Sequence, residues 1–256
     1  MKIAINGFGR IGRAVYRILH EREGVDVVAV NDLFDPAALV HMLKYDSVYR
    51  HFKGQATLEG DTLKTHRFAT RITAIKDPKT LPWRELGVDF VVESTGVFRK
   101  KEQCLAHVEA GARKVLLTVP AKDAIDAMVV LGVNDADLKP EHKVVSNASC
   151  TTNCLAPMAY VVDKAFGIER GLMTTIHAYT NDQRLVDMPH SDLRRARAAA
   201  MSIIPTTTGA ARAVGKILPH LNGKLDGISM RVPTPTGSVV DLVAVLKKKA
   251  TAEEIN

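Results

Sequence analysis

Short apolar runs alternate with stretches of helical periodicity over the first 149 residues. Lys2–Ile5 and Val25–Val30 have the composition of buried strands, and the apolar residues within 11–19 recur at the spacing of one helix face. Pro36 at a first helical position predicts a helix that ends near Leu43. Strands separated by helices indicate βαβ units and a mainly parallel sheet. Further expected elements are strands at Asp89–Glu93, Lys114–Leu117, Met128–Leu131 and Val144–Val145, and a helix at Glu102–Ala110.

Two parts of the chain depart from this alternation. Phe52–Ile75 alternates apolar and polar residues around a turn at Gly60-Asp61, which predicts a small antiparallel excursion. After residue 149 the strands become longer and 180–202 is irregular. The elements expected there are helices at Cys150–Phe166 and Gly209–Leu218, and strands at Leu172–Tyr179, Gly227–Pro233 and Val239–Lys247. We therefore expect two domains of an α/β protein, with the boundary between 149 and 150.

Composition narrows the class of protein. A chain of 256 residues with 46% hydrophobic and 25% charged residues is globular, not disordered or fibrous. The net charge of +7, from 35 basic and 28 acidic residues, suits acidic ligands such as phosphate esters, or weak nucleic-acid contact. No apolar run reaches about 18 residues and the first residues are too short for a signal peptide, so no membrane span or leader is expected. Three cysteines indicate a reducing compartment, the cytoplasm, and no disulfide scaffold.

A glycine-rich turn joins the first strand to the first helix. Gly7, Gly9 and Gly12 permit a tight turn and a close backbone approach to a pyrophosphate at a helix N-terminus. Asp32, twenty residues past Gly12, is placed to accept hydrogen bonds from a ribose and to repel a 2′-phosphate, which favours NAD over NADP. The alternative is a plain turn and a surface aspartate. The context favours a Rossmann-like dinucleotide-binding domain over 1–149.

Cys150 is the candidate nucleophile. It lies where a strand pattern meets a helix, and a thiol at a helix N-terminus has a lowered pKa. Cys154 follows one turn later, but no second pair of ligands matches it, so no metal site is expected. Cys104 lies within a helix pattern and is expected to pack in the core. From the residues alone, His177 is not distinguished from the other eight histidines.

Arginines and hydroxyl residues gather in the second half. Arg194-Arg195-Ala196-Arg197 and Arg231 could bind anions or form a solvated face, and the pattern does not choose between these alternatives. Thr206–Gly209 has the composition of a hydroxyl-rich helix entry, another anion-binding geometry.

Several motifs closely resemble those of the glyceraldehyde-3-phosphate dehydrogenase family, and the resemblance covers nearly the whole chain. They are residues 5–13 (INGFGRIGR), 148–154 (ASCTTNC), 177–183 (HAYTNDQ), 192–197 (DLRRAR), 206–211 (TTTGAA) and 230–234 (MRVPT). The resemblance implies oxidation of glyceraldehyde 3-phosphate to 1,3-bisphosphoglycerate with NAD and inorganic phosphate. It also implies an α+β catalytic domain with a mainly antiparallel sheet over 150–256, and a homotetramer formed through surfaces that include 180–202.

The resemblance also implies a role for individual residues. Cys150 adds to the aldehyde to give a hemithioacetal and then a thioester, and His177 acts as its base in a resting ion pair. Thr180 and Arg231 bind the substrate phosphate. The attacking phosphate is assigned to Ser149, Thr151, Thr208 and Gly209, with Arg195 on the same surface. NAD contacts are assigned to Gly7, Gly9, Arg10, Ile11, Gly12, Asp32, Lys76 and Thr118, with Leu33 and Pro189 at positions typical of NAD-specific members.

The chain departs from the family pattern at three places. Lys76 replaces a common arginine, and Tyr49-Arg50-His51-Phe52 replaces a histidine-glycine loop. Family members continue for several tens of residues beyond the position of Asn256, so we expect an incomplete catalytic domain. Two alternatives remain at this point: erythrose-4-phosphate dehydrogenase, and a truncated, non-catalytic chain that binds nucleotide or RNA.

Overall fold

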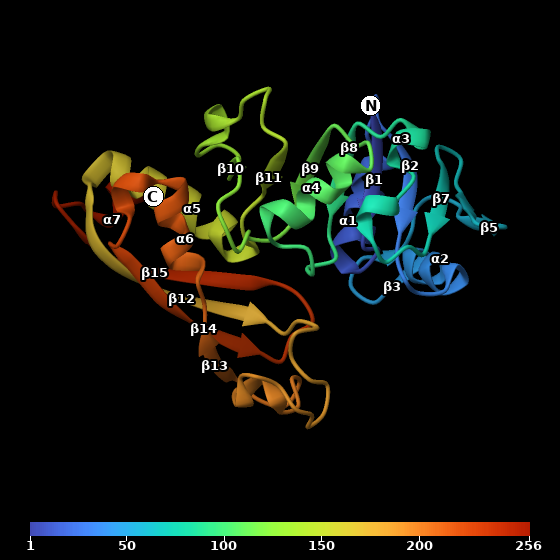
Figure 1. Cartoon of the computed structure of the whole chain (residues 1–256). Coiled ribbons are helices and arrows are strands. Elements are labelled where there is room, and N and C mark those ends of the chain that lie inside the picture. Colours follow the sequence, from blue (N-terminus) through green and yellow to red (C-terminus); the bar gives the residue numbers. More distant parts are fainter. The chain divides into compact units, whose positions relative to one another are not determined.

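The computed structural model describes all 256 residues, which form two compact units. The first unit comprises residues 1–128 and 137–147, and the second comprises residues 129–136 and 148–256. Figure 1 labels most of the helices and strands of both units.

The first unit is built on a nine-stranded sheet. Its order is β10 (Ala127–Met128), β11 (Val144–Ser146), β9 (Lys114–Leu117), β8 (Phe90–Glu93), β1 (Lys2–Asn6), β2 (Asp26–Asn31), β7 (Ala69–Thr73), β6 (Thr62–Lys64) and β5 (Thr57–Glu59). All neighbours from β10 to β7 pair in parallel, whereas β7, β6 and β5 pair antiparallel. The chain winds outward from β1 in one direction through β2 and in the other through β8. The switch point, where ligands of such folds bind, therefore lies between β1 and β8.

Both faces of this sheet are covered, which explains its nearly continuous apolar strands. On β1, Ile3 and Ile5 pack in one core cluster with Tyr16, and Ala4 packs in another with Trp83. The helices are α1 (Arg10–Leu19), α2 (Pro36–Lys44), α3 (Trp83–Leu86) and α4 (Lys101–Glu109), and a hairpin follows α2, formed by β3 (Tyr45–Asp46) and β4 (Arg50–His51).

The second unit contains a four-stranded sheet with two helices packed on it. Its order is β13 (Ile204–Thr207), β14 (Leu225–Val232), β12 (Ile168–Ala178) and β15 (Ser238–Leu246). The sheet is mainly antiparallel, with one parallel pair between β12 and β14. Helix α5 (Cys150–Phe166) packs on β12 and β15, and α6 (Ala210–Ile217) packs on β14. A short α7 (Ala252–Ile255) begins with a capping box at Thr251.

The periodicity of β12 decides which side chains face the helices. Met173 and Thr175 are each 1% exposed, whereas Leu172, directly before Met173, is 66% exposed. Side chains alternate between the faces of a strand, so His177 lies on the face that α5 covers.

Most predicted elements are confirmed, and two expectations are wrong. The strand expected at Met128–Leu131 ends at Met128, because Val129 and Val130 are buried by packing in the second unit without pairing in a strand. Thr206 belongs to β13, where it pairs with Ser229, and not to a helix entry. The turn at Gly60-Asp61 is confirmed between β5 and β6.

All three cysteines are free thiols. The longest helices lack the length and apolar character needed to cross a bilayer.

Candidate active site

The glycine loop between β1 and α1 tolerates no side chain at two positions. A Cβ at Gly12 would lie 2.1 Å from the carbonyl oxygen of Gly7. Gly7 itself has φ +93°, and a Cβ there would lie 2.6 Å from the backbone nitrogen of Thr95. Because these glycines pack directly against neighbouring backbone, they keep the turn tight at the start of a ten-residue helix, a geometry that fits a pyrophosphate group.

Asp32 lies beside this loop, at the carboxyl end of β2. Its Oδ2 accepts a hydrogen bond from the Phe8 backbone N–H at 2.6 Å, and its Oδ1 accepts one from Phe34 at 3.2 Å. Thr118 follows β9, where its N–H and hydroxyl both donate to the Glu93 carbonyl at 3.1 Å. The structure thus brings the glycine loop, Asp32 and Thr118 to one edge of the sheet. The other predicted NAD contacts in this unit, Ile11, Leu33 and Lys76, are exposed.

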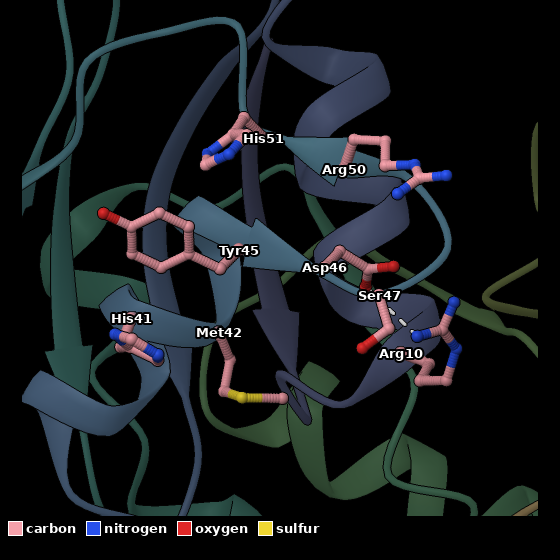
Figure 2. Close-up of a pocket in the computed structure, with 8 residues that line it drawn as sticks. All are labelled: Arg10, His41, Met42, Tyr45, Asp46, Ser47, Arg50 and His51. Carbon is pink, nitrogen blue, oxygen red and sulfur yellow. Dashed lines mark hydrogen bonds and ion pairs between the residues drawn. The ribbon is translucent and has the colours of Figure 1, made fainter.

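Arg10 begins α1 and faces a pocket of about 420 Å³ (Figure 2). Its Nη1 contacts Oδ2 of Asp46 at 3.1 Å, and the sequence had not indicated this partner. Burial alone would raise the pKa of Asp46, but the N–H groups of Tyr49 and Val48 together with Arg10 lower it overall. Arg50, in the loop that departs from the family pattern, has φ 64°, a left-handed conformation that favours glycine. The lining residues are Arg10, His41, Met42, Tyr45, Asp46, Ser47, Arg50 and His51.

In the second unit, Cys150 and His177 are in contact. Cys150 is the first residue of α5, and its Sγ lies 3.3 Å from Nε2 of His177 on β12. Ser149 caps the helix by accepting a hydrogen bond from the Thr152 N–H at 3.0 Å. The 17-residue helix therefore directs its positive end at an exposed thiol.

The electrostatics favour a thiolate–imidazolium pair. The hydrogen bond to His177 is the main cause that lowers the pKa of Cys150, and it outweighs the partial desolvation of the sulfur by its neighbours, which would raise that pKa. The same bond raises the pKa of His177 against the effect of burial, and the Ala178 carbonyl adds to the rise. Both shifts favour the charged forms, in which the imidazolium donates through Nε2 to sulfur and through Nδ1 to Ala178.

Arg231 lies beside this pair, because β14 runs parallel to β12 and places Arg231 opposite His177. Its Nη1 donates to the Ala178 carbonyl at 3.1 Å and to the Thr180 hydroxyl at 3.4 Å. Burial, reinforced by the charge of Arg195, lowers the pKa of Arg231, and its buried Nε has no partner. A half-buried guanidinium with unused hydrogen-bonding capacity is a suitable anion ligand.

The first turns of α5 and α6 adjoin one another. The Thr152 hydroxyl donates to the carbonyl of Ala210 at 3.4 Å. Gly209 caps α6, with open space where a Cβ would lie, and the Thr208 hydroxyl accepts from the N–H of Ala210 at 3.1 Å. Thr151 hydrogen-bonds to Cys150, which helps to lower the thiol pKa. Two helix N-termini thus meet near the thiol.

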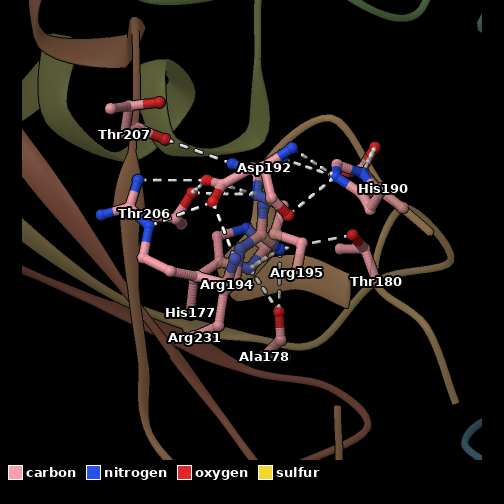
Figure 3. A network of polar contacts seen from close by, with 11 residues as sticks. His177, Ala178, Thr180, His190, Asp192, Arg194, Arg195, Thr206, Thr207 and Arg231 are labelled. Carbon is pink, nitrogen blue, oxygen red and sulfur yellow. Dashed lines mark hydrogen bonds and ion pairs between the residues drawn. The ribbon is translucent and has the colours of Figure 1, made fainter. Parts of the chain in front are cut away.

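Arg195 is enclosed in a polar network (Figure 3). Its Nε donates to the Thr206 hydroxyl at 2.9 Å, its Nη2 donates to the Thr207 carbonyl at 3.3 Å, and its Nη1 contacts Asp182. Asp192 accepts from the Thr206 hydroxyl at 2.9 Å. Arg195 is therefore held in a fixed orientation rather than solvated.

Two family models match this chain, one in its N-terminal part and one in its C-terminal part. Residues 1–101 match the NAD binding domain of glyceraldehyde 3-phosphate dehydrogenase, and residues 149–256 match its C-terminal domain. The chain is 61% identical to the glyceraldehyde-3-phosphate dehydrogenase of Borreliella burgdorferi over 262 residues, and 56% identical to that of Geobacillus stearothermophilus over 257. All of this chain is covered, with 78% and 76% of those relatives.

The chain belongs to the glyceraldehyde-3-phosphate dehydrogenase family. As a member it is an NAD-dependent oxidoreductase of glycolysis, and NAD is its cofactor. The comparisons do not favour the two alternatives, erythrose-4-phosphate dehydrogenase and a non-catalytic chain. No group of three or more His, Cys, Asp or Glu side chains is arranged to hold a metal ion.

Two acidic residues of the polar network around Arg195 were not predicted. Asp182 and Asp192 both contact Arg195, and Asp182 also lies 3.4 Å from His190. Both aspartates stand inside the family motifs, which was the available signal, but their partners come from separate segments. Pro189 lies in the same segment, where its carbonyl accepts from Arg184 at 3.1 Å.

Proposed function

We propose that Cys150 and His177 are the catalytic pair that oxidises glyceraldehyde 3-phosphate to 1,3-bisphosphoglycerate. The observation that carries this assignment is the 3.3 Å contact between the thiol and the imidazole at the start of α5. A free thiol has little thiolate at neutral pH, and both the imidazole and the helix dipole increase that fraction.

The chemistry proceeds on the sulfur of Cys150. Its thiolate adds to the aldehyde carbon, and the oxygen takes the Nε2 proton of the His177 imidazolium to become the hydroxyl of a hemithioacetal. His177 then takes the hydroxyl proton through Nε2 as the C–H bond breaks, which leaves a thioester. When bound, NAD⁺ supplies the hydride acceptor. Inorganic phosphate adds to the thioester carbonyl, the sulfur leaves as thiolate, and the acyl phosphate is released.

We assign the cofactor to the first unit, with the glycine loop and Asp32 as its main determinants. The tight backbone at Gly7 and Gly12 fits the pyrophosphate, and the Asp32 carboxylate fits a ribose without a 2′-phosphate. The proposed NAD contacts of this unit are Gly7, Gly9, Arg10, Ile11, Gly12, Asp32, Leu33, Lys76 and Thr118, and the family pattern adds Pro189 from the second unit.

We assign the substrate phosphate to Arg231 and Thr180. The unpartnered, buried Nε of Arg231 supports this, because a buried cation is most stable with an anion beside it. The attacking phosphate is assigned to the adjoining first turns of α5 and α6, namely Ser149, Thr151, Thr208 and Gly209. Arg195 contributes to the same positive region.

Replacing Arg231 tests the substrate assignment. We expect Arg231→Leu to lower kcat/KM for glyceraldehyde 3-phosphate by about 30- to 1000-fold, mainly through KM, because a buried charged hydrogen bond is lost. Steady-state assays with D-glyceraldehyde, which lacks the phosphate, separate binding from damage to His177. A loss of equal size with that aldehyde would remove Arg231 from the phosphate site. Arg212→Leu, at a largely exposed arginine paired with Asp226, is the control.

We further propose that the enzyme is a cytoplasmic homotetramer and that segment 180–202 lies in an interface between subunits. This segment exposes large apolar side chains: Leu185 at 81%, Leu193 at 79%, Val186 at 70% and Met188 at 60%. Apolar side chains gathered this closely usually mark an interface.

The oligomeric state can be measured by sedimentation. We expect Leu185→Asp to shift the enzyme toward smaller assemblies, since burying a carboxylate in an apolar interface is costly. Leu138→Asp, at a 44% exposed leucine outside the segment, should leave the distribution unchanged. An unchanged mass for Leu185→Asp would exclude this residue from an interface.

A further inference from the structure

Three hydrogen-bonded polar side chains are wholly buried in the first unit. Glu93, His107 and Trp83 are each 0% exposed. Trp83 Nε1 donates to Nδ1 of His107 at 3.0 Å, and Nε2 of His107 lies 3.0 Å from Oε2 of Glu93. An ionisable side chain buried this completely is costly unless every polar atom is satisfied.

The hydrogen bond from Trp83 determines the tautomer of His107. An indole N–H can only donate, so Nδ1 of His107 is an unprotonated acceptor. The imidazole proton is therefore on Nε2 and is donated to Glu93. The oxygens of the Glu93 carboxylate act as hydrogen-bond acceptors in this arrangement.

The Glu93 carboxylate joins two adjacent strand ends. Its Oε2 also accepts from the Asn6 side chain at 2.6 Å, and Asn6 ends β1 as Glu93 ends β8. Its Oε1 accepts from the backbone N–H of Thr95 at 2.9 Å and from the Thr95 hydroxyl. One buried side chain thus fixes the turn after β8 to the end of β1, at the switch point of the sheet.

That turn is the surface on which the glycine loop lies. The Ser94 hydroxyl donates to the Gly7 carbonyl at 2.6 Å. The Thr95 nitrogen lies where a Cβ of Gly7 would stand, with 2.6 Å between them. A displacement of Thr95 would therefore displace the loop.

The network continues to the second predicted cofactor determinant. Oδ1 of Asn6 accepts from the side chain of Asn31 at 2.8 Å, and Asn31 directly precedes Asp32. Oδ1 of Asn31 accepts in turn from Thr73 at 2.8 Å and from Ile75 at 2.9 Å. The ends of β8, β1, β2 and β7 are thus connected by one row of hydrogen bonds.

We propose that Glu93 is a positioning residue for NAD binding, held in its orientation by His107 and Trp83. It does not touch the cofactor. It holds the Thr95 turn and Asn6 so that the glycine loop and Asp32 keep their spacing. This inference rests on the proposed assignment of that loop and Asp32 as the NAD site.

Glu93→Gln tests the role of the carboxylate in the full chain. The amide has nearly the same shape but turns one acceptor into a donor, which opposes at least one of the four existing donors. By titration calorimetry we expect the Kd for NAD to rise by at least about tenfold. At saturating NAD, kcat and the KM for glyceraldehyde 3-phosphate should stay near the wild-type values.

Two further sets of variants separate positioning from general stability. Val91→Ala removes buried packing from the same strand, so it should lower the melting temperature without changing the Kd. His107→Gln keeps a donor for Glu93, whereas His107→Leu does not, so only His107→Leu should weaken NAD binding. His107→Leu should also shift the emission of Trp83, the single tryptophan, because leucine offers the indole N–H no acceptor.

The proposal fails if Glu93→Gln binds NAD within about twofold of wild type, or if Val91→Ala weakens binding as much as Glu93→Gln does. If Glu93→Gln does not fold, the two His107 variants decide the question, and equal Kd values for them would overturn the proposal. Asp32→Asn separates the two levels of inference. If Asp32→Asn weakens NAD binding and Glu93→Gln does not, only the role of Glu93 is rejected. If neither variant changes NAD binding, the proposed NAD site itself is rejected.

Discussion

Replacing Cys150 by serine is expected to lower kcat on the order of 10⁴-fold or more. Serine preserves the size of the side chain and the start of α5. However, its hydroxyl is a far weaker acid than the thiol, and the contact with His177 cannot convert it to an anion at neutral pH. Neither the hemithioacetal nor the thioester can then form. Steady-state NADH production and a single-turnover assay measure the loss.

The matched control for Cys150→Ser is Cys154→Ser, one helical turn along α5. Cys154 is also exposed and free, but it has no imidazole partner in the structure. We expect Cys154→Ser to retain kcat within about twofold, because it touches none of the groups that shift the thiol pKa. Wild-type turnover by Cys150→Ser, or equal losses in both variants, would contradict the thiol mechanism.

The elements that hold the candidate site could be predicted because their signals are local. Helix α5 has the predicted bounds, since Ser149 supplies its cap and Gly167 follows its end. The glycine loop follows from residues adjacent in sequence. Strand β13 was missed because its threonines have the composition of a helix entry, and only pairing with β14 makes them a strand.

What sequence could not provide were contacts between distant segments. Asn6 and Glu93 hydrogen-bond across 87 positions, and His177 and Arg231 are 54 apart. Neither pair has a local signature, because each is created by the order of strands in a sheet. The face of β12 that carries His177 is known only from the exposures along the strand and from the packing of α5, which brings the thiol to that face.

The predicted binding groups of the two units differ in kind. In the first, the predicted cofactor determinants are mainly backbone groups, whose positions depend on buried side chains such as Asn6 and Asn31. In the second, side chains at strand and helix ends provide the charges. Substitutions should accordingly act on NAD affinity through buried residues and on substrate affinity through partly exposed ones.

Replacing His177 by asparagine is expected to lower kcat by about 10²- to 10⁴-fold, the usual effect of removing a general base. The pH dependence should change as well. His177 lowers the pKa of Cys150, so the thiolate persists to a lower pH in the wild type. Without His177 the thiol pKa returns toward its ordinary value, and the acid limb of the pH profile moves to higher pH.

Alkylation by iodoacetamide isolates this effect from turnover, because its rate follows the thiolate fraction of Cys150. Wild-type enzyme should stay reactive at a pH where His177→Asn has become slow, and at high pH the two rates should converge. His190→Asn is the control, since His190 contacts Asp182 rather than the thiol. If His177→Asn alkylates with the wild-type pH profile, the imidazole does not stabilise the thiolate, and the lowered pKa must then come from the N-terminus of α5.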